Sequence, residues 1–200
     1  RLSARLIAAA LESRGTPAAY VDAREWTVTD DRFGAALVDV PATRAALAQL
    51  SLSWGSRVSI HTGFIGRTRD GRTTTLGRNG SDYTAALLAQ ALGARELTVW
   101  TDVDGVMTAD PSIVADAYPV PRLTQHEALE LANLGMRMFH PRTMLPLIEA
   151  NIPLRIRHTM RPDSPGTTVD SGADADEKRP ACVVSLEDLA LIDVEDNPVA

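Results

Sequence analysis

The sequence predicts an α/β protein with three layers and a mostly parallel central sheet. Short apolar runs typical of strands alternate with stretches of about ten residues or more that are typical of helices, an order that indicates βαβ units. Hydrophobic residues make up 44% of the 200 residues and charged residues 23%. This composition suits one folded domain with a sizeable core.

In the first part of the chain, residues 1–15 are predicted to form a helix that ends at Gly15. Its apolar residues share one face: Leu2, Leu6, Ile7, Ala10 and Leu11. A strand is predicted at 18–23, and a helix with a proline in its first turn at 41–50. A further strand, within 56–66, runs into a glycine-bounded turn.

The second part begins with a turn built on Asp70-Gly71, within residues 67–73. A helix then ends at Gly93, and a buried strand follows at 96–100. The remaining predictions are a helix at 124–135 with a capping box from Thr124 to Glu127, a helix at 140–151 and a strand at 153–159.

Composition excludes several classes of function. The net charge of −6 and the pI near 5.2 argue against a nucleic-acid surface and against binding to anionic membrane. No apolar run approaches the roughly 18 residues of a membrane span. With one cysteine and scattered histidines, we expect neither an internal disulfide nor a protein-held metal. The expected location is the cytoplasm.

The most informative stretch is "TTTLGRNGSDYTAALLAQAL", residues 73–92, where polar and glycine residues run into an apolar helix. The first amides of a helix lack internal partners, and its dipole is positive there. Arg78 adds donors suited to a carboxylate or a phosphate. Together these features predict an anion site in which Asp82 meets a lysine, Arg78 or Mg²⁺. Alternatively, Ser81 and Asp82 only cap the helix and Arg78 is a surface charge.

Two further candidate sites follow. Thr101 and Asp102 come directly after the strand at 96–100, where they can bind a ribose, a base or a metal-bound phosphate, although a tight turn explains them equally well. Arg137 lies between two helices and can meet a phosphate, or it can simply be a cation at a helix C-terminus. His140, before Pro141, is expected to be a structural cap and not a catalyst.

Four motifs in order resemble the aspartokinases of the amino acid kinase family: "GFIGRTRDGRTTTLGRNGSDYTAALLAQAL", "WTDVDGVMTADP", "EALELANLGMRMFHPRT" and "IPLRIRHT…SPGTTV". The resemblance covers residues 1–169 and implies the C-terminal portion of a catalytic domain with the amino acid kinase fold. Asn79 in "LGRNGSDY" is most like the bifunctional aspartokinases. Residues 170–181 are then a linker, and 182–200 resemble the start of an ACT-like regulatory region.

The resemblance implies an aspartate kinase that uses ATP and Mg²⁺ to make 4-phospho-L-aspartate from L-aspartate, the first step toward lysine, threonine and methionine. It assigns the α-carboxylate of aspartate to Arg78 and the orientation of a catalytic lysine to Asp82. The other implied contacts are Asn79, Gly80 and Ser81 with aspartate, and Thr101, Asp102, Met107, Ser112, Arg137 and Met138 with the nucleotide.

Departures from the family keep an alternative open. Met107 stands where the family usually has tyrosine, Ser112 where it has arginine, and Arg137 where it has lysine. The N-terminal segment with the catalytic lysine is absent, so we expect these 200 residues to be a fragment that is inactive alone. The alternative is a non-catalytic remnant that binds nucleotide or aspartate, or serves as an assembly partner. A Rossmann dehydrogenase also fits the alternation but lacks the glycine fingerprint. The resemblance further implies a homodimer in the full-length protein and fusion to a second pathway enzyme.

Overall fold

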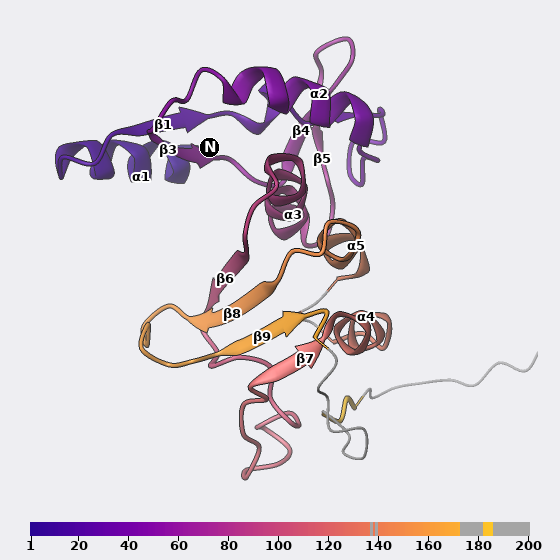
Figure 1. Ribbon diagram of the computed structural model, residues 1–200. Helices are drawn as coiled ribbons and strands as arrows, with labels where there is room; N and C mark the ends of the chain where they lie inside the picture. The colour runs from indigo at the N-terminus through magenta and orange to yellow at the C-terminus, as the bar shows by residue number, and fades with distance from the viewer. Residues whose placement is uncertain (137, 139, 173–181, 186–200) are drawn as a thin grey trace, which may run out of the picture.

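The computed structural model describes residues 1–136, 138, 140–172 and 182–185. Figure 1 shows two tiers. One holds the N-terminal helices and strands, and the other holds a four-stranded sheet with the last two helices beside it. Helix α3 (Gly80–Leu92) lies between the tiers and packs on elements of both.

The N-terminal tier contains two small sheets. Strands β1 (Ala18–Val21) and β3 (Val58–His61) pair in parallel, flanked by α1 (Leu2–Ser13). The second sheet has the order β2 (Val28–Thr29), β4 (Ile65–Thr68), β5 (Thr73–Thr75), and β4 and β5 form the hairpin whose turn was predicted at Asp70-Gly71. The other elements of this tier are the 3₁₀ turn η1 (Ala23–Glu25) and α2 (Val40–Ser51).

The other tier has the strand order β6-β8-β9-β7. The elements are β6 (Leu97–Thr101), β7 (Arg122–Thr124), α4 (Gln125–Asn133), α5 (Pro141–Glu149), β8 (Leu154–His158) and β9 (Thr167–Asp170). Strands β6 and β8 are parallel, as are β7 and β9, whereas β8 and β9 are antiparallel. The predicted α/β class is therefore confirmed, but the described strands form three hydrogen-bonded sheets and not one.

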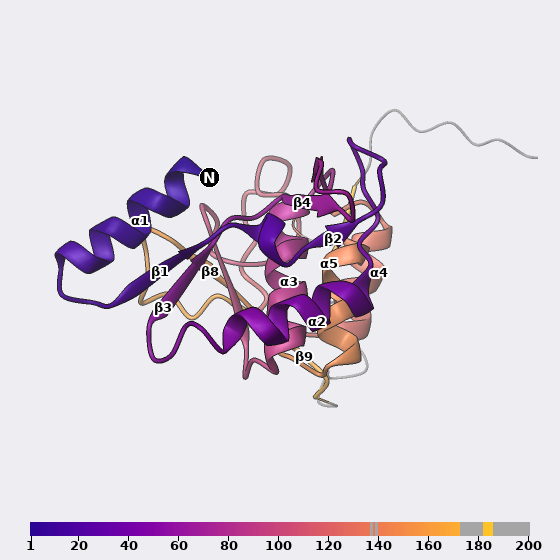
Figure 2. The same ribbon diagram turned by 90° about the horizontal axis from the view of Figure 1, so that it is seen from above.

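The predicted helix at 1–15 is present, but its leucine face is exposed. Leu2 is 72% exposed and Leu6 61%, whereas Ala4 and Ala8 are buried. The small alanine side chains let the helix backbone approach β1 and β3 closely, and that contact turns the leucines outward. Figure 2 shows α1 lying along the outer side of these strands.

The strand predicted at 96–100 is also less buried than expected. Its residues are mostly half-buried, and Trp100 is 48% exposed beneath the guanidinium of Arg157, which lies 5.0 Å from its ring centroid. Strand β6 pairs with β8 on one side and has no strand partner on its other side within the described ranges. A strand is fully buried only when other elements cover both of its faces and both of its edges, and one edge of β6 has no strand partner among the described residues.

Two hydrophobic clusters form the core, and α3 contributes to both. Ala86 and Ala89 belong to the cluster centred on α4, α5 and the four-stranded sheet. Leu87 belongs to the cluster that contains Trp26 and Leu47. Because α3 is apolar on opposite sides, its N-terminus is fixed relative to both tiers.

The predicted linker and regulatory region lie almost entirely outside the described residues, which omit 173–181 and 186–200. Of residues 182–185, Cys182 and Val184 pack against the larger cluster, and the amide of Val183 donates to the carbonyl of Thr108 at 2.8 Å. The ACT-like region stays a prediction. None of the described helices is long and apolar enough to cross a membrane.

The predicted capping box of α4 is confirmed. Thr124 Oγ1 accepts the amide of Glu127 at 3.1 Å, and Glu127 Oε2 accepts the amide of Thr124 at 2.7 Å. We expect Thr124→Ala to lower the free energy of unfolding by about 1 kcal/mol, because one helix amide loses its acceptor. Chemical denaturation measures this. Ser13→Ala is the control, since that hydroxyl only contacts a carbonyl in its own exposed helix end. Equal effects would contradict a capping role.

Candidate functional site

The start of α3 has the sharp backbone that its sequence indicates. After β5, Gly77 has a φ of 78° and Asn79 a φ of 52°, and the helix begins at Gly80. Glycine adopts positive φ at no steric cost, and asparagine is among the few other residues that do so readily. The positive φ angles of Gly77 and Asn79 bend the backbone sharply, and Arg78 and Ser81 are exposed beside the start of the helix.

The end of β3 lies directly against this turn. A Cβ atom on Gly80 would be 2.8 Å from Phe64 Cδ2, and one on Gly63 would be 3.0 Å from Ser81 Cα. Thr84 Oγ1 donates to the carbonyl of Gly80 at 2.7 Å and accepts the amide of Phe64 at 3.1 Å. Sequence reasoning did not include Gly63 and Phe64 in the site. The sequence signal that could have included them is the Gly63-Phe64 pair in the predicted glycine-bounded turn. In the structure, Phe64 has a φ of 74°.

The side chains of this turn are available to a ligand. Arg78 is exposed, and among the described residues no hydrogen bond, ion pair or ring contact engages it. Asp82 is half-buried, and its Oδ2 accepts Asn79 Nδ2 at 3.4 Å. Asn79 is the N-cap residue but makes no side-chain capping bond. In the part of the chain that the structure describes, Ser81 and Asp82 make no side-chain capping bond to the helix, whereas the exposed Arg78 fits both the predicted anion site and the alternative of a surface charge.

Thr101 and Asp102 lie where predicted, at the carboxyl end of β6. The carbonyl of Thr101 accepts both the amide and Oγ1 of Thr159, at 2.7 and 2.9 Å. Its own hydroxyl donates to Asp102 Oδ1 at 3.2 Å, and Asp102 is exposed. Asp104, in contrast, forms an ion pair with Arg161 at 2.8 Å.

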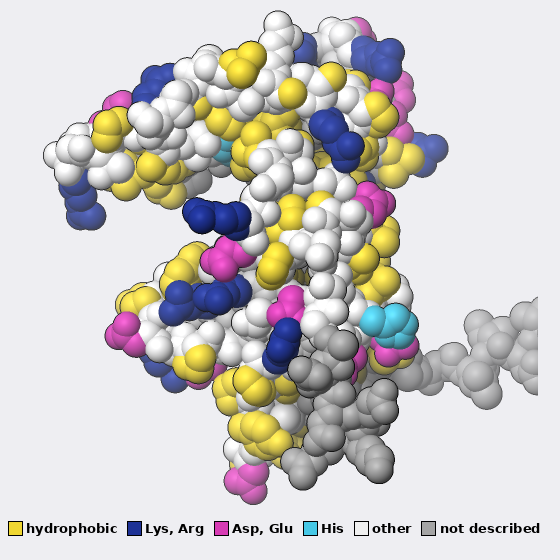
Figure 3. Space-filling model, in the orientation of Figure 1, with side chains coloured by type: hydrophobic (Ala, Val, Ile, Leu, Met, Phe, Trp, Pro, Cys, Tyr) yellow, Lys and Arg dark blue, Asp and Glu magenta, His cyan; other side chains and the backbone are white. Residues whose placement is uncertain are grey.

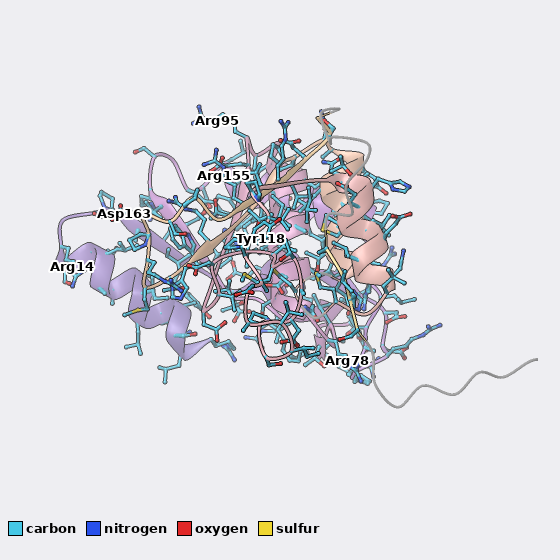
Figure 4. All side chains as sticks on the ribbon, turned by 90° about the horizontal axis from the view of Figure 1, so that it is seen from below. Arg14, Arg78, Arg95, Tyr118, Arg155 and Asp163 are labelled. Atoms are coloured by element: carbon cyan, nitrogen blue, oxygen red, sulfur yellow. The ribbon has the colours of Figure 1, made fainter. Side chains whose placement is uncertain are left out.

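The direction of the chain brings the two predicted sites toward the same end of the molecule. Helix α3 and strand β6 run in opposite directions, and Figure 4 shows Arg78, before α3, and Arg95, before β6, at opposite edges of the view. The 13 residues of α3 span about 20 Å and the five of β6 about 17 Å. The strand therefore runs back toward the end of the molecule at which the helix began, so Thr101 lies nearer to that end than Leu97 does.

The other predicted nucleotide contacts are only partly placed. Met107 forms an isolated bridge with Pro119, and Ser112 Oγ donates to Asp110 Oδ1 at 2.6 Å on an exposed loop. Met138 packs against the larger hydrophobic cluster. Arg137 lies outside the described residues. His140 is the N-cap of α5, and its Nδ1 accepts the amide of Arg142 at 3.2 Å, so the predicted capping role is confirmed.

Titratable groups near the strand ends are held in fixed charge states. Burial between the rings of Trp26 and Trp54 lowers the pKa of His61 to about 4, so this imidazole is neutral at pH 7. The hydrogen bond from Arg24 lowers the pKa of Asp22 to about 2, so that carboxylate is ionised. Within the described ranges, no group of three or more histidine, cysteine or acidic residues could hold a metal ion.

The face in Figure 3 is hollowed between the tier of α1, β1 and β3 and the strands β6 and β8. Arginine and acidic side chains border this hollow, with hydrophobic side chains behind them. Figure 4 places Arg78 and Arg95, which flank α3 in the sequence, at opposite edges of the molecule.

The α/β fold, the polar start of α3 and the polar end of β6 are those expected of the amino acid kinase family, and the comparison with family profiles agrees. The profile of the amino acid kinase family matches residues 1–158, so the chain belongs to this family. Membership removes the Rossmann dehydrogenase alternative.

Within the family, the chain is similar to aspartokinases. It is 40% identical over 199 residues to "Aspartokinase 3, chloroplastic" of Arabidopsis thaliana, covering 96% of this chain and 35% of that protein. It is 41% identical over 169 residues to "Lysine-sensitive aspartokinase 3" of Escherichia coli, covering 84% and 38%. The chain thus spans little more than a third of the length of these relatives.

A solved structure agrees with the sequence relatives. E. coli aspartokinase III in complex with aspartate and ADP superposes with a TM-score of 0.82 at 40% identity, over 86% of this chain and 39% of that one. The bifunctional aspartokinase/homoserine dehydrogenase of Haemophilus influenzae is 34% identical over 97% of this chain and 24% of its own. The predicted amino acid kinase fold and the resemblance to aspartokinases are both confirmed.

Proposed function

We propose that this chain is part of an aspartate kinase, which transfers the γ-phosphoryl group of ATP to the side-chain carboxylate of L-aspartate. A carboxylate oxygen forms a bond to phosphorus, the bond from phosphorus to the ADP oxygen breaks, and 4-phospho-L-aspartate and ADP leave. The observation that carries the proposal is the pairing of two ligand-ready ends, the first turn of α3 and the carboxyl end of β6, toward one end of the molecule. The aspartate and ADP bound by the similar E. coli enzyme support it.

The residues divide the work between the two substrates. Arg78 binds the α-carboxylate of aspartate, and the amides of the first turn, with Asn79, Gly80 and Ser81, surround it. Thr101 and Asp102 bind the nucleotide, which enters as its magnesium complex. Mg²⁺ keeps several waters and needs only one or two carboxylates besides the phosphates. Catalysis is by positioning and charge stabilisation, so no covalent nucleophile is required.

The wider setting is also a proposal. The bifunctional relatives support fusion to a homoserine dehydrogenase in the full-length protein. A homodimer and a cytoplasmic location remain predictions from the sequence. Met107 and Ser112, in place of the family's usual tyrosine and arginine, favour the alternative of a non-catalytic binding protein, and the experiment below separates the two.

The test is a hydroxylamine assay on the natural full-length protein with Mg·ATP and L-aspartate. Acyl phosphates react with hydroxylamine, so we expect ATP-dependent aspartyl hydroxamate at typical enzyme rates, about 1–10³ s⁻¹. L-Glutamate is the control, because it carries the same groups with one more methylene between them, and it should react far more slowly. Binding of Mg·ADP and aspartate by calorimetry, without hydroxamate, would establish the non-catalytic alternative. The absence of both would refute both functions.

A further inference from the structure

Arg142 makes three contacts that reach far along the sequence. It is the second residue of α5, and it is half-buried. Its Nη1 donates to the carbonyl of Leu76 at 3.2 Å and its Nη2 to the carbonyl of Ala36 at 3.1 Å. Its guanidinium carbon lies 4.9 Å from the centroid of the Tyr83 ring. One planar group therefore joins a helix start, two loops and an aromatic face.

These contacts flank the turn that carries the proposed aspartate site. Leu76 is fully buried two residues before Arg78, and its amide donates to the carbonyl of Phe64 at 2.9 Å. Arg142 holds the carbonyl of that same residue. Tyr83 lies in the first turn of α3, one residue after Asp82. One side chain, that of Arg142, thus contacts both ends of the segment between Leu76 and Tyr83.

The loop at Ala36 belongs to the same arrangement. The amide of Ala36 donates to the carbonyl of Thr75 at 3.0 Å, and the carbonyl of Phe33 accepts both the amide and Oγ1 of Thr75, at 3.0 and 2.6 Å. Arg142 donates to the carbonyl of Ala36, so both backbone polar groups of Ala36 are hydrogen-bonded. The strand leading into the turn is therefore supported from a loop that is itself tied to Arg142.

The backbone of Arg142 leads toward the other proposed site. Its amide donates to Nδ1 of His140, the N-cap of α5, and Met138 lies two residues before that cap. Met138 is a residue assigned to the nucleotide by resemblance to the family. A shift of the start of α5 when nucleotide binds would move the guanidinium, and with it Leu76 and Tyr83.

We propose that Arg142 is a positioning residue that sets Arg78 and Asp82 for catalysis and couples nucleotide binding to aspartate binding. The proposal rests on the proposed aspartate kinase function. Arginine suits the task because its rigid fork reaches two carbonyls while its flat face stacks on Tyr83, which a lysine ammonium cannot do at once. Coupling through a shared rigid contact is reciprocal, so each ligand should tighten binding of the other.

The test compares Arg142→Ala and Arg142→Lys with Arg57→Ala in the full-length protein. Arg57 is a matched control, because it also donates to two carbonyls, those of Trp54 and Ser53, but belongs to the connection before β3. We expect both Arg142 variants to raise the aspartate KM about 10-fold and to lower kcat by about 10-fold or more, since small displacements of positioned groups have effects of that order. The affinity for Mg·ATP in the absence of aspartate should change by less than about 2-fold, as should every constant of Arg57→Ala, whereas the KM for Mg·ATP at saturating aspartate should rise by the lost coupling, about 5-fold.

Calorimetry measures the coupling between aspartate and Mg·ADP binding, which would not change if Arg142 had only a structural role. We expect aspartate to tighten Mg·ADP binding in the wild type, by a factor of about 5 or more, and not to do so in the Arg142 variants, whose ADP affinity without aspartate is unchanged. Unaltered coupling, or equal weakening of both substrates together with a lower melting temperature, would overturn the proposal. Wild-type values in Arg142→Lys would also overturn it, because the fork would be unnecessary.

The same measurements separate this proposal from the proposed function. Active wild-type protein with unaffected Arg142 variants refutes the role of Arg142 alone. Wild-type protein that binds both ligands without turnover refutes the kinase activity, while the coupling measurement still decides the role of Arg142. Wild-type protein that binds neither ligand refutes both.

Discussion

Replacing Asp82 with asparagine in the full-length protein is expected to lower kcat about 100-fold or more, with only a modest change in the aspartate KM. Asp82 lies in the first turn of α3, half-buried, and among the described residues no cation pairs with it. Resemblance to the family gives it the orientation of a catalytic lysine. A preorganised charge partner acts mainly in the transition state, so its loss appears in kcat.

Asparagine has nearly the shape of aspartate, so α3 itself should be undisturbed. The matched control is Asp39→Asn, at the N-cap of α2, where the carboxylate accepts the amide of Ala42 at 3.1 Å and lies in a different helix from the site. Steady-state kinetics on both variants gives the comparison. If Asp82→Asn turns over like the wild type, Asp82 only complements the dipole of α3, and the catalytic assignment is wrong.

Arg78→Ala is expected to raise the aspartate KM strongly and to leave the KM for ATP nearly unchanged. A hydrogen bond to a charged group contributes about 1.5–3 kcal/mol, which corresponds to about 10-fold to 150-fold in affinity. Because Arg78 is exposed and free of protein partners within the described ranges, its removal should not change the free energy of unfolding. The whole effect should therefore appear in ligand binding.

Arg95→Ala is the matched control for this change. Arg95 is also exposed, and Figure 4 places it at the opposite edge of the molecule. Initial-rate measurements with each substrate varied in turn distinguish the possible roles of Arg78. A rise in the ATP KM in place of the aspartate KM would assign Arg78 to the phosphates, and our assignment to the α-carboxylate would be wrong.

The features predicted correctly from the sequence are those whose signals are local. Gly93 ends α3 with a φ of 59°, and the Thr124 box begins α4, because a cap involves residues only three or four positions apart. The α3 turn was found for the same reason, since its glycine, arginine and acidic residues are adjacent in the chain. The same residues predicted an anion site there and left a capping role open, and only the assignment of aspartate as the ligand came from resemblance.

The features that were missed depend on contacts between distant residues. The amide of Phe64 and the hydroxyl of Thr84 are 20 positions apart, and Arg142 reaches a carbonyl 106 positions away. No periodicity or spacing in one sequence indicates such pairs. The exposed leucines of α1 have the same cause, because the choice between two apolar faces of a helix is made by whatever packs against it.

The shared helix α3 has a consequence for how the molecule loses its structure. Since Ala86 and Ala89 complete one cluster and Leu87 the other, neither tier can open locally without exposing apolar surface of the same helix. Subglobal opening of one tier should therefore weaken the other, and the two should behave as one cooperative unit. The turn with Arg78 and Asp82 begins that helix, so the proposed aspartate site should persist until the cooperative unit as a whole unfolds.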